Sequence, residues 1–151
     1  FLSEEINEQY LTNNLSKGDV LIWEGYIFED GNCKDSRFLV LSECEDGNFL
    51  AVRATTKTNF YEKLKVSLYR EFIVIPKDQE SSLPEKTIID FNLVKCFTID
   101  EIKKLFGENI RKKERISEKL ICEINNRVRF SKTIEKNIKN RIPIYDSELP
   151  F

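Results

Sequence analysis

The sequence predicts a mainly β domain followed by a helical segment, and three observations lead to this prediction. Five short runs rich in β-branched and aromatic residues lie between residues 20 and 94. Asp-Gly pairs at 30–31 and 46–47 separate the first three runs and favour tight hairpins, because such turns need a positive φ. After Gly107 apolar residues recur every four positions, which is typical of an α-helix. Short strands joined by tight turns indicate a small, strongly bent sheet or barrel.

The β-rich runs define the strands and loops that we expect. The segments 57–63 and 77–86 are expected to be loops, and prolines flank the second of them. The five expected strands are Val20 to Tyr26, Phe38 to Cys44, Asn48 to Thr55, Leu64 to Ile75 and Thr87 to Val94.

Helices are expected on both sides of this β region. Residues 1–16 form an N-terminal arm or a short amphipathic helix. The sequence Thr98-Ile-Asp-Glu has the form of a capping box and Gly107 that of a C-cap, which predicts a short helix over 99–106. A longer helix is expected from Glu114 to Arg129, continuing towards residue 140.

These elements give a domain plan. It comprises an arm (1–16), a barrel domain (17–107), a C-terminal helical extension (108–142) and a tail (143–151). A chain of 151 residues, 40% of them apolar, is long enough for one domain with a packed core.

Composition excludes several classes of function. The formal net charge is −2, so any RNA site must be a local basic patch. The sequence has no histidine, which excludes Ser-His-Asp and Cys-His nucleophile systems and histidine metal sites. We therefore expect no metal and no cofactor. The four cysteines lack CxxC spacing, and no apolar run is long enough for a signal sequence or a membrane span, so we expect a cytoplasmic protein with reduced thiols.

One pair of neighbouring strands carries the candidate chemistry. An arginine opens the apolar part of the run KDSRFLVLS at 34–42, and a threonine pair closes the run NFLAVRATTK at 48–57. A hairpin would bring Arg37 and the hydroxyl groups of Thr55 and Thr56 to one rim of the sheet. A guanidinium can stabilise the negative charge that develops on a reacting phosphate group, because it stays cationic and offers a planar fork of donors to phosphate oxygens.

With the preceding KGDVLIW at 17–23, and with FIVIP at 72–76 and TIDEIKKL at 98–105 further on, this pattern resembles the MazF/PemK family of toxin endoribonucleases. The resemblance implies an SH3-like barrel of the CcdB/MazF type and metal-independent cleavage of single-stranded RNA that leaves a 2′,3′-cyclic phosphate. It also implies catalytic roles for Arg37 and Thr55, with Thr56 as the alternative one residue on. A type II toxin–antitoxin role, a homodimer and an antitoxin partner are implied in the same way. Asp35 is a candidate base.

An RNA site also needs contacts to phosphates and bases. We expect Lys34, Arg53 and Lys57 to contact phosphates, and Trp23, Tyr26 and also Phe28 to offer faces for base stacking. Each of these residues also has an ordinary structural explanation, since aromatic residues commonly pack in the core and a strand arginine commonly pairs with a surface carboxylate.

Two alternatives remain open. Family members commonly have proline after the loop arginine, where this chain has Phe38, and the loop at 29–35 is acidic. Both features favour a non-catalytic module that binds nucleic acid or protein on the same fold. A topoisomerase poison like the CcdB branch ranks lower, because the end of the chain, residues 147–151, does not resemble that branch.

Overall fold

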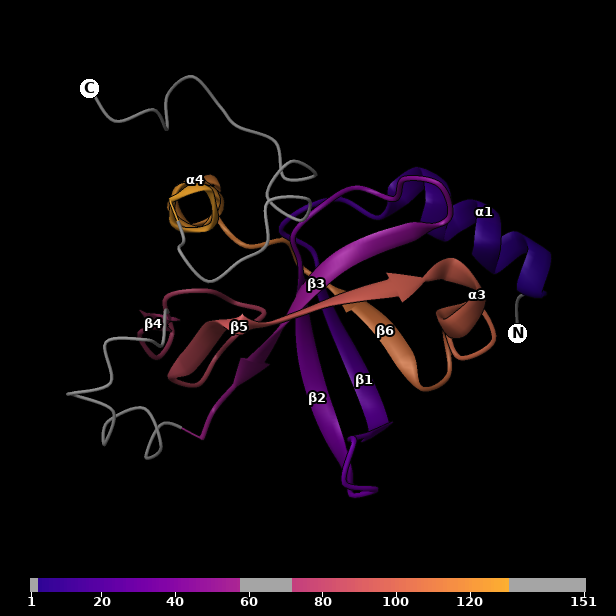
Figure 1. Ribbon diagram of the computed structural model, residues 1–151, viewed down its shortest axis with the longest axis horizontal. Helices are drawn as coiled ribbons and strands as arrows, with labels where there is room; N and C mark the ends of the chain where they lie inside the picture. The colour runs from indigo at the N-terminus through magenta and orange to yellow at the C-terminus, as the bar shows by residue number, and fades with distance from the viewer. Residues whose placement is uncertain (1–2, 58–71, 131–151) are drawn as a thin grey trace.

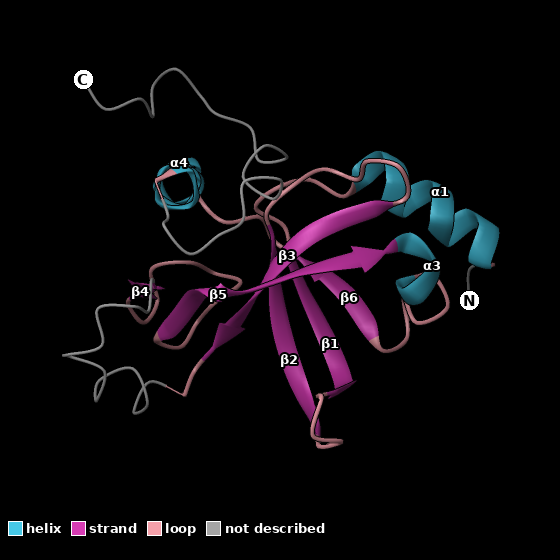
Figure 2. Cartoon of the chain, in the orientation of Figure 1, coloured by secondary structure: helices cyan, strands magenta, loops and turns pink. Residues whose placement is uncertain are grey.

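The computed structural model describes residues 3–57 and 72–130. In this part of the chain six strands form one antiparallel sheet in the order β4-β5-β3-β2-β1-β6 (Figure 1). The strands are β1 (Val20–Ile27), β2 (Cys33–Val40), β3 (Asn48–Thr55), β4 (Phe72–Ile75), β5 (Thr87–Thr98) and β6 (Ile110–Lys113). The helices are α1 (Glu4–Asn14), α3 (Ile99–Ile102) and α4 (Glu118–Arg129) (Figure 2).

The prediction of a mainly β fold with helices is confirmed. Within the described ranges β4 and β6 lie at opposite ends of the strand order and do not pair with each other, so the sheet is not closed into a barrel. Both Asp-Gly turns adopt the positive φ angles that the sequence predicted, with Gly31 at 85° and Gly47 at 78°.

Three strands differ from expectation. The strand β5 runs to Thr98, four residues beyond the expected end, and β2 ends at Val40, four residues before its expected end. The strand β2 begins at Cys33, five residues before the expected start, because the polar residues 33–37 pair with β1 without any hydrophobic alternation to mark them. The expected helical extension from 108 begins instead with the edge strand β6, whose sequence IRKK carries no strand pattern. The expected strand at 64–75 is described only over β4, and both the helix beyond 130 and the tail lie outside the described residues.

The sheet has an apolar cluster on each face, and Figure 1 shows α4 well separated from α1 and α3. One cluster joins the sheet to α4 and includes Val20, Leu39, Val52, Ala54, Ile89, Ile121 and Ile124. The other joins the opposite face to α1 and α3 and includes Leu11, Leu21, Phe38, Phe49, Phe97, Ile102 and Ile110. We call the first the helix-covered face, because α4 lies against it.

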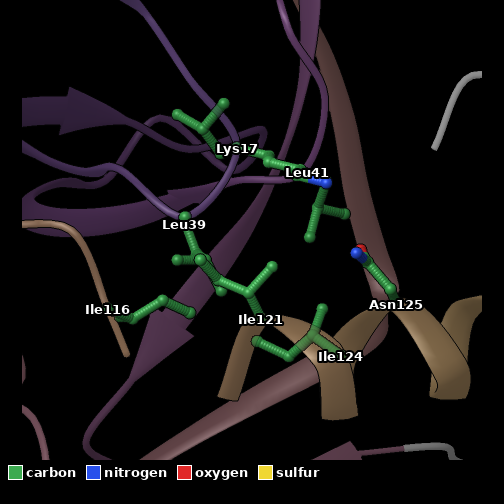
Figure 3. Close-up of a pocket in the computed structure, with 9 residues that line it drawn as sticks. Lys17, Leu39, Leu41, Ile116, Ile121, Ile124 and Asn125 are labelled. Carbon is green, nitrogen blue, oxygen red and sulfur yellow. The ribbon is translucent and has the colours of Figure 1, made fainter. Parts of the chain in front are cut away.

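The contact between α4 and the sheet is close. Ser117 caps α4 by accepting a hydrogen bond from the Leu120 N–H, as expected for the start of a helix. Between the helix and the sheet lies a cavity of about 10 Å³, lined by residues that include Leu39, Ile121 and Asn125 (Figure 3). A volume of this size holds one water molecule at most. This cavity is therefore not a ligand site.

The helices α1 and α3 are joined through a buried amide. The Asn7 side chain donates to the carbonyl oxygens of Lys103, at 2.9 Å, and Phe106, at 3.1 Å. The predicted cap is present, since the Thr98 hydroxyl accepts a hydrogen bond from the Glu101 N–H at 3.2 Å. The helix is shorter than the predicted 99–106, because α3 ends at Ile102. None of the helices in the described residues is both long and apolar enough to cross a membrane.

Candidate nucleic-acid interface

Strand alternation divides the predicted site between the two faces of the sheet. In the pairing of β2 with β3, Arg37 lies opposite Ala54 and Phe38 lies opposite Arg53. Paired residues share a face and successive residues alternate. Because Ala54 belongs to the cluster under α4, Arg37 lies on the helix-covered face, whereas Arg53 lies with Phe38 on the other face.

The same register also separates Arg37 from Thr55. By alternation along β2 and β3, Ser36 and Thr55 lie on the face of Phe38 and Arg53, and so does Lys34. The structure thus does not bring the Arg37 guanidinium and the Thr55 hydroxyl together on one face. A shift of one residue reverses every side chain of a strand, and sequence spacing alone does not reveal the register.

Arg37 has a structural contact. It is half-buried, and its Nη1 donates a hydrogen bond to the carbonyl oxygen of Ser82, in the loop between β4 and β5. The same loop is tied to α4 by the buried Glu80, whose carboxylate accepts hydrogen bonds from the Ser117 N–H at 2.7 Å and the Ser117 hydroxyl at 2.9 Å. Arg37 therefore takes part in holding this loop on the helix-covered face.

Asp35, the candidate base, holds a β-bulge. Its Oδ1 accepts a hydrogen bond from the Gly25 N–H at 2.9 Å, and Gly25 has a φ of 71°. The pairing of β1 with β2 shifts register here, between Trp23 and Tyr26. Because a bulge inserts one extra residue, these two aromatics, three positions apart, both pack against the same apolar cluster.

The aromatic residues on this face form a connected set. The Tyr26 ring centre lies 5.0 Å from Trp23, 5.1 Å from Phe28 and 5.0 Å from Phe38, each in edge-to-face geometry. Phe38 is fully buried, whereas Trp23, Tyr26 and Phe28 are half-buried. The predicted stacking residues thus pack against the core on one side and are partly exposed on the other.

Two cations lie next to these rings. The Arg53 guanidinium lies 4.4 Å from the centre of the Phe28 ring, and its Nε is buried without a hydrogen-bond partner. The Lys95 ammonium donates to the Tyr26 hydroxyl at 2.8 Å and lies 5.2 Å from the ring centre. Sequence reasoning missed Lys95. Alternation with the apolar Phe97 would have placed it on this face.

Two further lysines extend the positive charge. Lys34 and Lys57 are both exposed, and the pKa of Lys34 is lowered, chiefly by the neighbouring Lys57 ammonium, then by burial and by the charge of Arg53. We name the surface formed by these residues the cationic face. It consists of Lys34, Arg53, Lys57 and Lys95 together with Trp23, Tyr26 and Phe28.

The ion pairs between described residues do not involve the four cations of this surface. Asp30, in the acidic hairpin turn, forms no ion pair with these cations. Its carboxylate accepts hydrogen bonds from the backbone and side chain of Asn32 instead, at 3.0 and 2.9 Å. A chain with a net charge of −2 therefore carries a local basic patch.

The two threonines lie beside this surface. Thr55 is on the cationic side of the sheet but only 8% exposed, and its hydroxyl accepts a hydrogen bond from the Lys57 N–H at 3.2 Å. Thr56, after the strand end, is exposed. The described residues contain no group of three or more Asp, Glu or Cys side chains placed to hold a metal ion.

Comparison with known proteins adds no assignment. No protein-family model matches the chain, and no curated protein matches its sequence.

Proposed function

We propose that this protein binds single-stranded RNA through the cationic face. The observation that carries the proposal is the placement of Arg53 and Lys95 against half-buried aromatic rings, with Lys34 and Lys57 nearby, in a chain that is acidic overall. Lysine ammonium groups contact phosphates without regard to sequence, and aromatic rings and arginine planes stack on unpaired bases.

The form of the surface favours a single strand. Stacking on a protein ring requires an exposed base face, and bases within a duplex do not offer one. Phe28 lies in the β1–β2 turn and carries Arg53 above it, so an aromatic ring and a guanidinium plane lie together at the outer end of the sheet. The MazF/PemK resemblance is a further reason to choose RNA rather than DNA.

The test compares two arginines in neighbouring strands. Binding of a fluorescein-labelled, mixed-sequence RNA oligonucleotide is followed by anisotropy for the wild type, Arg53→Ala and Arg37→Ala. Arg53→Ala should weaken binding about tenfold, because stacking contributes ~1–3 kcal/mol per base. Arg37→Ala should leave the affinity within about twofold, because the interaction of Arg37 is with Ser82 on the other face. Absence of binding by the wild type, or equal losses in the two variants, would contradict the proposal.

A second candidate function is the metal-independent endoribonuclease of a toxin–antitoxin pair. One observation favours it: Thr55 lies on the cationic side between Arg53 and Lys57, where it could reach a bound phosphate after a local rearrangement. The SH3-like fold of the CcdB/MazF type, the homodimer and the antitoxin partner belong to this proposal.

A cleavage assay separates the two functions. Incubation of the same RNA in EDTA should yield products with 2′,3′-cyclic phosphate ends if the protein is a nuclease, and Thr55→Ala should abolish them. Intact RNA, bound with the affinity measured by anisotropy, would favour the binding module. Cleavage that persists in Thr55→Ala would reject the assigned role of that threonine.

A further inference from the structure

The Tyr26 hydroxyl and the Lys95 ammonium meet on the cationic face, although they belong to strands that are not neighbours. Tyr26 lies on β1 and Lys95 on β5, and both β2 and β3 lie between these strands in the sheet. Lys95 lies opposite Ala51, which belongs to the same apolar cluster as Phe38, so its side chain leaves the sheet on that face. The fold of the sheet thus brings two polar groups together on one surface.

Their hydrogen bond leaves further donors for a ligand. Lys95 Nζ lies 2.8 Å from the Tyr26 hydroxyl oxygen but 5.2 Å from the ring centre, so the ammonium lies beyond the hydroxyl and not over the ring. A phenolic hydroxyl has one O–H donor, and an ammonium has three N–H donors. Because the hydroxyl oxygen accepts from Lys95, its own hydrogen needs another acceptor, and it has none among the described residues.

A second tyrosine–lysine pair, Tyr10 and Lys112, differs in this respect. Lys112 Nζ lies 5.6 Å from the centre of the Tyr10 ring, 3.7 Å from Asp19 Oδ2 and 3.4 Å from the Asn14 carbonyl oxygen. The protein itself therefore supplies an anionic partner for this lysine. The pair on the cationic face has no such partner within residues 3–57 and 72–130, which leaves its charge and its donors for an anionic acceptor.

We infer that Tyr26 and Lys95 together bind one backbone phosphate of the RNA. This inference rests on the proposed function and specifies it further. The ammonium supplies the charge, and the hydroxyl donates a second hydrogen bond, which the cationic donor on its oxygen strengthens. The Tyr26 ring centre lies 5.1 Å from that of Phe28, so the phosphate lies beside the ring that carries Arg53. The Tyr26 ring already contacts three other rings edge to face, and its contribution to binding is therefore the hydroxyl rather than a stacking surface.

The experiment measures RNA affinity against salt concentration for the wild type, Tyr26→Phe, Lys95→Gln and the double variant. Tyr26→Phe keeps the ring and should weaken binding about tenfold, with an unchanged slope of log K against log salt. Lys95→Gln should make the slope less negative by about 0.7, the value for one phosphate contact on a single strand, whereas Lys95→Arg should keep it. The double variant should lose less affinity than the product of the single losses, because both groups bind the same phosphate.

The second tyrosine–lysine pair provides the matched controls. Tyr10→Phe and Lys112→Gln should change the affinity by less than about twofold and leave the slope unchanged. Binding of DNA of the same sequence is measured in parallel, and Tyr26→Phe should weaken it by the same factor, since both nucleic acids have the phosphate. Circular dichroism of each variant verifies that the sheet is intact.

The outcomes distinguish this phosphate site from the function it rests on. An unchanged slope in Lys95→Gln would overturn the site, because the hydrogen bond would then serve only the shape of the sheet. A loss in Tyr26→Phe that appears with RNA but not with DNA would also overturn it, because the hydroxyl would then contact the ribose 2′-OH. If both variants bind RNA as the wild type does, while Arg53→Ala binds weakly, the site is wrong and the RNA-binding function stands. If the wild type does not bind RNA, both fail.

Discussion

Both faces of the sheet carry charged residues, but these residues make different contacts on the two faces. On the helix-covered face Arg37 donates to a loop carbonyl, and Glu80 of the same loop accepts from the start of α4. On the cationic face Arg53 lies over the Phe28 ring and Lys95 donates to the Tyr26 hydroxyl, and their charges have no ion pair among the described residues. The comparison teaches that the immediate neighbours of a charged residue decide its role: a loop carbonyl binds Arg37, whereas Arg53, in the described part of the chain, has only an aromatic ring beside it.

Gly18 gives the largest expected effect, because it lies where α4 contacts the sheet. It has a φ of 90°, and a Cβ atom there would lie 2.6 Å from Cδ1 of the buried Ile121. Gly18→Ala should lower the free energy of unfolding by on the order of 3 kcal/mol through backbone strain and overpacking. Gly47→Ala is the control, because Gly47 has a φ of 78° with no heavy atom within 4 Å of the added Cβ. Urea unfolding should show a smaller loss for Gly47→Ala, and equal losses would mean that α4 does not fix this contact.

Glu80 should have the next largest effect. Its buried carboxylate accepts two hydrogen bonds from Ser117, at the positive end of α4. Hydrogen bonds to charged groups contribute ~1.5–3 kcal/mol, so Glu80→Ala should destabilise the protein by about 2 kcal/mol. Glu80→Gln keeps one acceptor oxygen and should cost less. Both variants should bind RNA normally when folded, since they alter only the helix-covered face, and a loss of affinity in the folded variants would break the separation between the faces.

The sequence predicted those local features well that depend on a property of one residue and its near neighbours in the chain. The Asp-Gly turns and the Thr98 cap depend on backbone angles and on a hydrogen bond three residues away, and the structure confirms both. The five-residue extension of β2 and the basic strand β6 were missed, because their strand conformation comes from pairing with β1 rather than from local preference.

The sequence predicted most residues of the candidate site, but it did not predict on which face of the sheet each residue lies. Lys34, Arg53, Lys57, Trp23 and Tyr26 were expected to act together. Four of them lie on one face of the sheet, and Lys57 follows the end of β3. Arg37 and Asp35 were expected beside them, but they lie on the other, because the register of β2 against β3 is a tertiary property. Gly25 was the one local sign of the bulge that turns Tyr26 towards Trp23, and glycine has too many other uses to predict a bulge by itself.

Asp35 tests how the two faces depend on each other. The carboxylate lies on the helix-covered side, yet its hydrogen bond to Gly25 N holds the bulge that aligns Tyr26 with Trp23. Asp35→Ala should destabilise the protein by about 1 kcal/mol and weaken RNA binding, because the aromatic set loses its alignment. Asp35→Asn keeps an acceptor oxygen and should behave more like the wild type. If Asp35 is instead a catalytic base, Asp35→Asn should abolish RNA cleavage while leaving stability and affinity unchanged.

The titration of Lys34 gives the smallest and most local test. Its pKa lies below the ordinary value of 10.5 because of Lys57, so the charged form is disfavoured in the folded protein. Between the lowered pKa and 10.5 the unfolded chain binds more protons than the folded protein does. The free energy of unfolding should therefore rise slightly with pH in that window. RNA binding should change in the opposite direction, since a phosphate favours the protonated amine, so affinity should fall as pH rises through the same pKa. NMR of ¹³C-labelled lysine side chains measures the titration, with 2′-O-methyl RNA as a ligand that resists alkaline hydrolysis. Lys57→Gln should return the Lys34 midpoint towards 10.5, and bound RNA should raise it in the wild type. A midpoint that neither change moves would mean that the two amines do not meet at the end of the hairpin.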